Sequence, residues 1–184
     1  GFDKGLAMEA LRNSATLSER GQGLRMQYGY IPCDLYNESV ATDMEYAIAD
    51  EAIASAAKVL GHDEDYEYFH SRSHSYRNFF DPKTGFMRGK DSKGAFREPF
   101  DPYASNHGHS DYTEGTAWQY IWLVPQDVDG LVECFGSREA TLQKLDSLFM
   151  VSSEIIGENA SADISGLIGQ YAHGRSEERR VGKE

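Results

Sequence analysis

One stretch of the chain combines a carboxylate with a dense group of aromatic residues. It runs from Asp111 to Asp127, reads DYTEGTAWQYIWLVPQD, and contains both tryptophans of the chain. Glu114 lies within it, on a Thr-Glu-Gly turn. Aromatic faces stack on the apolar faces of sugar rings, and a carboxyl group pressed against aromatic walls loses hydration, which raises its pKa. Such a group can protonate a departing glycosidic oxygen, so the pattern predicts Glu114 as a general acid.

The same residues also fit a purely structural role. Tryptophan and tyrosine bury large areas, so aromatic runs are often core. An acid at a helix entrance can simply favour the helix dipole. On this interpretation the chain is a non-catalytic helical carbohydrate-binding or scaffold domain, with both indoles buried and no cleft at Glu114. A helical module of repeat type is a third interpretation, which the absence of a fixed period disfavours.

Composition sets the broad class of the protein. The chain has 184 residues, 40% hydrophobic and 26% charged, which suits one domain with a core of its own. No apolar run reaches membrane-spanning length. The net charge of −12 argues against a nucleic-acid partner, which favours a basic surface. Cys33 and Cys134 are widely spaced, and we expect buried free thiols.

The first half of the chain reads as helices. The spacing of apolar residues predicts a helix over residues 4–17, followed by a break at Gly21–Gly23 and an extended segment near Pro32. A long, alanine-rich helix begins at a cap on Asn37 or Ser39 and ends at Gly61. This helix carries Asp43, Glu45, Asp50 and Glu51, and most of these acidic residues are expected on a solvated face. Glu45 and the neighbouring Tyr46 are the exceptions that we single out.

The second half alternates turns and shorter helices. A helix capped by Asp63 leads to the turn Asp81–Gly85. A hairpin is expected next, between Phe86–Arg88 and Phe96–Pro99. Further helices follow: one over residues 116–123, one that begins at Pro125 and ends at Gly136, and one capped by Ser137 with Leu142, Leu145, Leu148 and Phe149 inside. Helix after helix with one minor hairpin predicts an all-α assembly, which antiparallel helix pairs would fit.

Histidines give only weak indications of a metal site. His70 and His74 are four residues apart on a helix, a spacing found in zinc sites, but no third ligand is near in the sequence. His107, His109 and Asp111 lie in a loop. We therefore expect His70 and His74 at the surface or at its boundary, and the second segment as a loop that leads into the Thr-Glu-Gly stretch.

Several motifs together resemble a known family of enzymes. They are Gly29–Pro32, Ser39–Val40 with Glu45–Ala47, Asp65–Phe69, Phe80–Arg88 apart from Lys83, Thr113–Gly115, Ala117–Tyr120 and Gly166–Gly174. In this combination they are similar to the bacterial α-mannosidases of glycoside hydrolase family 92. The resemblance implies an exo-acting, inverting, calcium-dependent α-mannosidase whose catalytic domain is an (α/α)6 toroid packed on an N-terminal β-sandwich domain. Residues 1–174 would form part of that toroid, and residues 175–184 would be a non-native tail.

The resemblance also implies roles for individual residues. Glu114 matches the general acid of the family's Thr-Glu-Gly motif, and the catalytic base would lie downstream of residue 174. Our candidates for binding a glycan substrate are Trp118, Tyr112, Arg88, Glu45 and His173. The Ca²⁺ ligands are not assigned. The substrates would be terminal α-mannosides of N-glycans or mannan, and the full-length protein would be periplasmic, cell-surface or secreted. Thr116 and Gln126 stand where the family often has Asn and His.

Overall fold

The computed structural model describes residues 1–106, 108–158, 160, 164 and 167–172. These residues form seven α-helices, one 3₁₀ helix and one pair of short strands. The elements are α1 (Lys4–Ala15), α2 (Gln22–Tyr28), α3 (Ser39–Leu60), α4 (Asp63–Ser73), η1 (Ser75–Asn78), β1 (Phe80–Asp81), β2 (Phe86–Met87), α5 (Ala117–Tyr120), α6 (Val128–Phe135) and α7 (Arg138–Met150). The predicted helical fold with a minor hairpin is confirmed. None of the described helices is both long and apolar enough to cross a bilayer.

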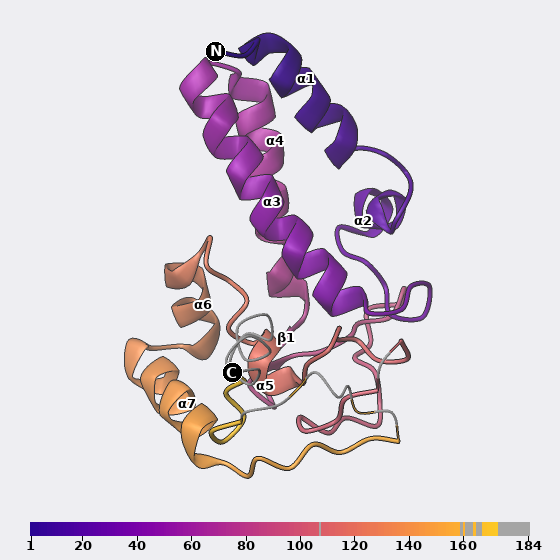
Figure 1. Ribbon diagram of the computed structural model, residues 1–184, viewed down its shortest axis with the longest axis vertical. Coiled ribbons are helices and arrows are strands. Elements are labelled where there is room, and N and C mark those ends of the chain that lie inside the picture. Colours follow the sequence, from indigo (N-terminus) through magenta and orange to yellow (C-terminus); the bar gives the residue numbers. More distant parts are fainter. Residues whose placement is uncertain (107, 159, 161–163, 165–166, 173–184) are drawn as a thin grey trace, which may run out of the picture.

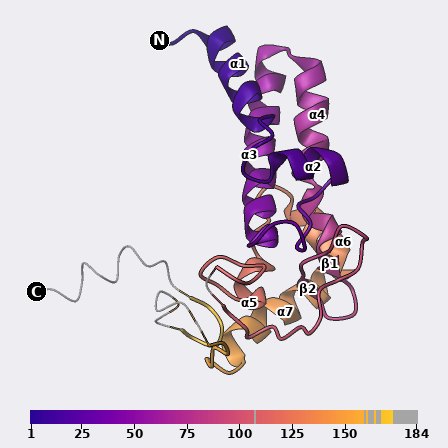
Figure 2. The ribbon, with the colours of Figure 1, turned by 90° about the vertical axis from the view of Figure 1, so that its right-hand side faces the viewer.

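The helices divide the molecule into an arm and a base. Helices α3 and α4 form a long antiparallel pair, and α1 runs beside α3 (Figures 1 and 2). The N-terminal end of α3 enters a broader base made of the strands, α5, α6 and α7. A small apolar core joins the arm helices through Met8, Ile53, Ala57 and Phe69. The alanines of α3 make this close approach of helices possible.

The ends of α3 show one correct prediction and one error. Gly61 ends the helix as predicted, with a φ of 76° and its N–H bonded to carbonyls of the last turn. The N-cap is Glu38, not Asn37 or Ser39. Glu38 has a φ of 53°, and no side chain caps the helix there. The carboxylate of Glu38 is bonded elsewhere, to Thr113.

Helix α2 was not expected. Glycines flank it on both sides, Gly21 with a φ of 82° and Gly29 with a φ of 78°. The pattern at Gly21–Gly23 indicates a break, and the break is real, but a helix of seven residues follows it. This helix is held by two buried polar side chains, Gln22 and Arg25, and such tertiary contacts leave no periodic signal in the sequence.

Arg25 lies at the centre of a buried ion network. Its Nε lies 3.0 Å from Asp43 Oδ1, and its Nη1 lies 2.5 Å from Asp50 Oδ2. The two carboxylates are 0% and 1% exposed. The predicted solvated position of these two residues is therefore wrong, because α2 brings a guanidinium against that face of α3. Arg72 of α4 also reaches Asp50, at 3.1 Å, so the network ties three helices together.

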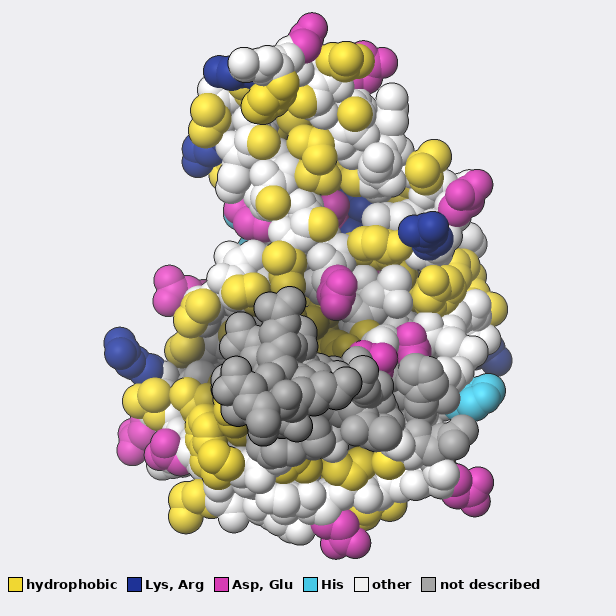
Figure 3. Space-filling model, in the orientation of Figure 1, with side chains coloured by type: hydrophobic (Ala, Val, Ile, Leu, Met, Phe, Trp, Pro, Cys, Tyr) yellow, Lys and Arg dark blue, Asp and Glu magenta, His cyan; other side chains and the backbone are white. Residues whose placement is uncertain are grey.

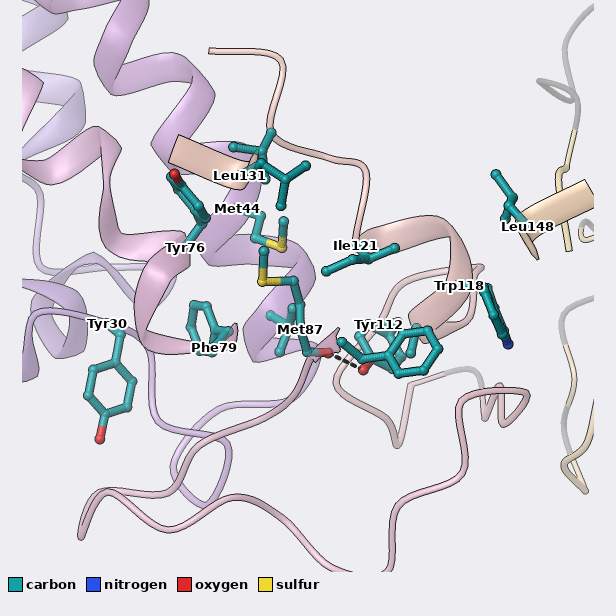
Figure 4. Packing of buried hydrophobic residues seen from close by; sticks show 14 residues of the cluster. Tyr30, Met44, Tyr76, Phe79, Met87, Tyr112, Trp118, Ile121, Leu131 and Leu148 are labelled. Atoms are coloured by element: carbon teal, nitrogen blue, oxygen red, sulfur yellow. Dashed lines mark hydrogen bonds between the residues drawn. The ribbon is translucent and has the colours of Figure 1, made fainter. Parts of the chain in front are cut away.

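The larger apolar core lies in the base. Aromatic and sulfur-containing side chains from η1, the strands and α5 meet there, among them Tyr76, Phe79, Met87, Tyr112 and Trp118 (Figure 4). The Trp118 ring packs edge-on against Phe86, with ring centroids 4.9 Å apart. This core supports the segment that carries Glu114 from below.

The hairpin forms one turn earlier than predicted. Phe80 pairs with Met87 and Asp81 with Phe86, across the turn predicted at Asp81–Gly85. The side chain of Asp81 accepts hydrogen bonds from Lys83 N–H at 3.0 Å and Thr84 Oγ1 at 2.9 Å, which stabilise the turn. The predicted pairing of Phe86–Arg88 with Phe96–Pro99 is reduced to a single bridge between Lys90 and Phe96.

The last helices agree with the prediction in their ends more than in their faces. Ser137 caps α7 and Gly136 ends α6, as expected. Helix α6 begins at Val128, not at Pro125, because Asp127 caps it. Leu148 is buried, whereas Leu142 and Phe149 are 50% and 44% exposed, so the predicted inner face of α7 is only partly correct. Cys33 and Cys134 are both free, as predicted, but only Cys33 is buried and Cys134 is partly exposed.

Asp127 links α6 to η1. One carboxylate oxygen accepts the Gly130 N–H at 2.9 Å, and the other accepts the Tyr76 hydroxyl at 2.7 Å. Burial opposes ionisation of this carboxyl group, but the hydrogen bonds outweigh it, so the pKa of Asp127 is lowered. The ionised form therefore stabilises the fold above the ordinary aspartate pKa. This contribution is lost as the pH falls through the lower pKa of the folded state.

We expect Asp127→Asn to flatten the acid limb of the stability curve. Asparagine still caps a helix, so the change removes mainly the charge. Urea unfolding measured from pH 7 down to about pH 3, on either side of the ordinary aspartate pKa of about 3.9, should show a smaller loss of stability in the variant. Asp146→Asn on the exposed face of α7 is the control and should follow the parent protein. Equal slopes for Asp127→Asn and the parent would contradict this role.

Candidate functional site

A cavity separates α3 from the segment that carries Glu114. Its volume is about 560 Å³. It is lined by Ala41, Thr42, Glu45, Tyr46, Ala49, Thr113, Glu114 and Tyr120. Figure 3 shows a hollow with acidic side chains at its rim on the face below the upper helices. Two of the residues predicted from the sequence, Glu45 and Glu114, thus line one concave surface, although they come from distant parts of the chain.

Glu114 occupies an unusual backbone conformation. Its backbone φ of 50° lies in the left-handed region, which residues other than glycine rarely adopt. The Tyr120 hydroxyl binds both backbone groups of the neighbouring Thr113. It donates a hydrogen bond to the Thr113 carbonyl at 2.7 Å and accepts one from the Thr113 N–H at 3.3 Å. Strained residues that are held by their surroundings cluster at functional sites. The turn therefore presents the Glu114 side chain to the cavity in a defined direction.

The residues after Glu114 fix the start of α5. Thr116 caps the helix, and its own N–H donates to Gln119 Oε1 at 2.6 Å, which forms a capping box. Gly115 packs against Tyr120, and a Cβ added there would lie 2.8 Å from that ring. A side chain at position 115 would displace Tyr120 from the wall of the cavity. The Thr-Glu-Gly-Thr sequence thus sets both the turn and the aromatic wall.

The aromatic wall is built from tyrosines. Tyr46 and Tyr120 line the cavity, whereas Trp118 and Tyr112 lie in the core beneath it (Figure 4). Trp118 is only 7% exposed, and the Tyr112 hydroxyl donates to the Met87 carbonyl. The expected enclosure of Glu114 by indole rings is therefore wrong. Residues 118 and 120 lie about half a helical turn apart, so residue 118 faces the core and residue 120 faces the cavity.

Tyr120 is a neutral hydrogen-bonding group in this wall. Burial raises the pKa of Tyr120 to about 12, and the negative charge of Glu45 acts in the same direction. The phenol therefore keeps its proton at neutral pH and donates it to the Thr113 carbonyl. The carboxyl side chains of Glu45 and Glu114 themselves are exposed at the cavity. The arrangement offers two solvent-accessible carboxylates beside phenol rings, which can bind hydroxyl groups and transfer a proton.

Arg88, another predicted residue, does not line this cavity. Arg88 is 5% exposed, and its guanidinium nitrogens lie 2.7 Å from Asp81 and 2.7 Å from Glu98. These ion pairs engage both Nη atoms of Arg88, which braces the hairpin against the following loop. His173 lies outside the described residues, as do His107 and residues 175–184.

The histidines on α4 have partners other than a metal. His70 Nδ1 lies 2.8 Å from Glu51 Oε2, and His74 Nε2 lies 3.3 Å from Asp127 Oδ2. Across the described part of the chain, no group of three or more His, Cys, Asp or Glu side chains is arranged to hold a metal ion. These residues alone therefore do not fit a complete Ca²⁺ site.

Sequence comparison identifies the family. Residues 1–178 match the catalytic domain of glycosyl hydrolase family 92. The chain belongs to this family. A curated relative, an uncharacterized secreted glycosidase of Arthroderma benhamiae, is 27% identical over 87% of this chain and 25% of its own length.

Solved structures of family 92 have the same arrangement of helices. The α-mannosidase BT3965 from Bacteroides thetaiotaomicron, in complex with mannoimidazole, is 43% identical, with a TM-score of 0.86 over 95% of this chain and 23% of its own. The inverting mannosidase BT2199 from the same species is 29% identical, with a TM-score of 0.78 over 98% of this chain and 26% of its own. These matches confirm the predicted fold class, helix pairs that form part of an (α/α)6 toroid. The chain spans about a quarter of the length of the relatives it matches.

Sequence reasoning missed part of the site. Tyr46 and Thr113 line the cavity, yet neither was among the candidates for binding substrate, although Tyr46 was singled out beside Glu45. Tyr46 follows Glu45 directly in the family motif, and Thr113 precedes Glu114 directly. Both adjacent positions carried a signal that could have been used, because neighbours of a catalytic turn often line the same pocket.

Proposed function

We propose that this chain is part of the catalytic domain of an inverting, calcium-dependent exo-α-mannosidase. The enzyme would hydrolyse terminal α-mannosides of N-glycans or mannan. The observation that supports this most directly is the cavity that Glu114 and Glu45 share. The non-catalytic alternative expected no cleft at Glu114. Of the two solved family 92 structures described above, one is named an α-mannosidase and the other an inverting mannosidase, which favours mannose as the sugar.

Glu114 is the general acid in this proposal. Its carboxyl group donates a proton to the glycosidic oxygen as the bond from that oxygen to the anomeric carbon breaks. Because the side chain is solvent-accessible at the cavity, it can recover its proton from water after each turnover. Inversion requires a second carboxylate about 6.5–9.5 Å away, which activates water on the opposite face of the sugar. That base is assigned to the protein beyond residue 174.

Glu45, Tyr46 and Tyr120 bind the substrate in this proposal. The Glu45 carboxylate accepts hydrogen bonds from sugar hydroxyls, and the tyrosine rings offer apolar faces for stacking. Trp118, Tyr112 and Arg88, which we also proposed as binding residues, would act by supporting the cavity from the core. His173 remains proposed as a substrate ligand in the segment that follows.

The full-length enzyme would contain further parts. Ca²⁺ is the proposed cofactor, a hard cation that takes oxygen ligands, and most of its ligands would come from outside the described residues. The remaining helices of the toroid and an N-terminal β-sandwich domain would complete the protein, and residues 175–184 would not belong to it. A periplasmic, cell-surface or secreted location is proposed; the curated relative is named as secreted.

Release of mannose tests this proposal. The full-length protein that contains this segment should release mannose from α-mannosides, and the chain of residues 1–184 alone should not, because it lacks the base. The same assay with β-mannosides and α-glucosides serves as the specificity control. Hydrolysis of α-glucosides in preference to α-mannosides would contradict the proposed substrate, and mannose release by the chain alone would contradict the proposed position of the base.

A further inference from the structure

Two residues with left-handed backbone conformations are joined across the rim of the cavity. Glu38 has a φ of 53° and Glu114 a φ of 50°. Between them lies Thr113, whose Oγ1 donates a hydrogen bond to Glu38 Oε2 at 2.8 Å. The acceptor is a carboxylate, and hydrogen bonds with an ionised partner are stronger than neutral ones. The residue directly before Glu114 is thus held by a charged side chain at the start of α3.

The backbone at the start of α3 holds the same segment. The first N–H groups of an α-helix have no partner within the helix. Here the Glu38 N–H donates to the Ser110 carbonyl at 2.8 Å, and the Ala41 N–H donates to the Asp111 carbonyl at 3.1 Å. The segment before Glu114 is therefore attached to α3 through its main chain and through the Thr113 side chain.

Tyr120 fastens Thr113 from the opposite side. Its hydroxyl donates to the Thr113 carbonyl at 2.7 Å and lies 3.3 Å from the Thr113 nitrogen. Thr113 is therefore fixed by Glu38 on one side and by Tyr120 on the other. A left-handed residue is strained and persists only where its neighbours are fixed.

We propose that Glu38 is a positioning residue, which acts through Thr113 to hold the Glu114 carboxyl group in the direction needed for proton transfer. The inference rests on the proposed function. Glu38 does not line the cavity, and its effect passes through the peptide between Thr113 and Glu114. Without the Thr113–Glu38 bond, the turn can relax toward negative φ, which moves the Glu114 side chain relative to the glycosidic oxygen. Sugar binding by the rest of the cavity stays in place.

The test separates proton transfer from binding and from stability. Thr113→Val removes the hydroxyl and keeps the branched shape, Thr113→Ser restores the hydroxyl, and Glu38→Gln removes the charge of the acceptor. All are made in the full-length enzyme and compared with Glu114→Gln. Each is assayed with two substrates. An alkyl α-mannoside has a poor leaving group that needs a proton, whereas the dinitrophenolate of 2,4-dinitrophenyl α-mannoside departs without one. Thermal unfolding is recorded for every variant.

Thr113→Val should lower kcat on the alkyl mannoside about tenfold, equivalent to about 1.4 kcal/mol in the barrier. Activity on the dinitrophenyl mannoside and KM for both substrates should change less than about twofold, which corresponds to less than about 0.4 kcal/mol in free energy. Glu38→Gln should show the same selectivity with a smaller loss, because the amide oxygen still accepts a hydrogen bond. Thr113→Ser, which keeps the hydroxyl, should retain most of the parent activity.

Three results would overturn the inference, and a fourth would overturn the proposed function. If Thr113→Val slows both substrates equally, or Thr113→Ser fails to restore activity, the contact supports only the fold. If Glu114→Gln is selective for the poor leaving group and Thr113→Val is not, Glu38 has no positioning role while the proposed function stands. If Glu114→Gln itself lacks selectivity, the proposed function fails first, which distinguishes the two failures.

Discussion

Glu114→Gln in the full-length enzyme is expected to slow hydrolysis of alkyl α-mannosides by about 10²–10⁴-fold, the usual contribution of a general acid. Glutamine keeps the size and the hydrogen bonds of the side chain but cannot supply the proton. Because the sugar is bound by other residues of the cavity, KM should change little. Rates measured with a series of leaving groups should fall most steeply in the variant where the leaving group is most basic.

A matched control is available on α7. Glu139 is exposed and lies away from the cavity, so Glu139→Gln should keep full activity on every substrate. A second comparison uses Glu45→Gln, which should raise KM more than it lowers kcat, because Glu45 is proposed to bind hydroxyl groups. Unchanged turnover of alkyl mannosides by Glu114→Gln would remove the acid role from this residue.

Asp43→Ala is expected to destabilise the protein by about 3–5 kcal/mol, the range for removing one partner of a buried ion pair. Asp43 is fully buried and accepts hydrogen bonds from Arg25 Nε at 3.0 Å, Ser75 Oγ at 2.5 Å and the Ile31 N–H at 2.7 Å. The substitution orphans all three donors at once. Urea unfolding followed by circular dichroism measures the loss.

Asp146→Ala is the control for this measurement. Asp146 is exposed on α7, and surface substitutions of this kind usually change stability by less than about 0.5 kcal/mol. A loss below about 1 kcal/mol for Asp43→Ala would fall outside the range for a broken buried pair. It would mean that Asp50 alone is a sufficient partner for Arg25, and that the Arg25–Asp43 pair does not fix α2 against α3.

Local signals predicted the elements of this fold well, and tertiary contacts account for the errors. The alanine-rich run and Gly61 define α3 from the sequence alone. Helix α2 was missed because it is short and depends on Arg25, whose partners lie 18 and 25 residues away. For the same reason the burial of Asp43 and Asp50 was not foreseen, since an acidic residue on a helix is usually exposed.

The site was predicted in its acids but not in its walls. The Thr-Glu-Gly turn and the Glu45 motif are both local, and both glutamates line the cavity. A short helix such as α5 gives no periodic signal to show which ring faces inward, so Trp118 was placed in the wall where Tyr120 lies. The contact between Glu38 and Thr113 joins residues 75 positions apart, and only the fold reveals it.

A crystal structure of the full-length enzyme with a mannose-configured inhibitor would test the central claim most directly. The inhibitor atom that replaces the glycosidic oxygen should lie within about 2.6–3.2 Å of a Glu114 carboxyl oxygen, the distance required for proton transfer. The sugar ring should lie in the cavity between α3 and the segment from Thr113 to Tyr120. An inhibitor bound elsewhere, with Glu114 facing solvent and this cavity unfilled, would contradict the account.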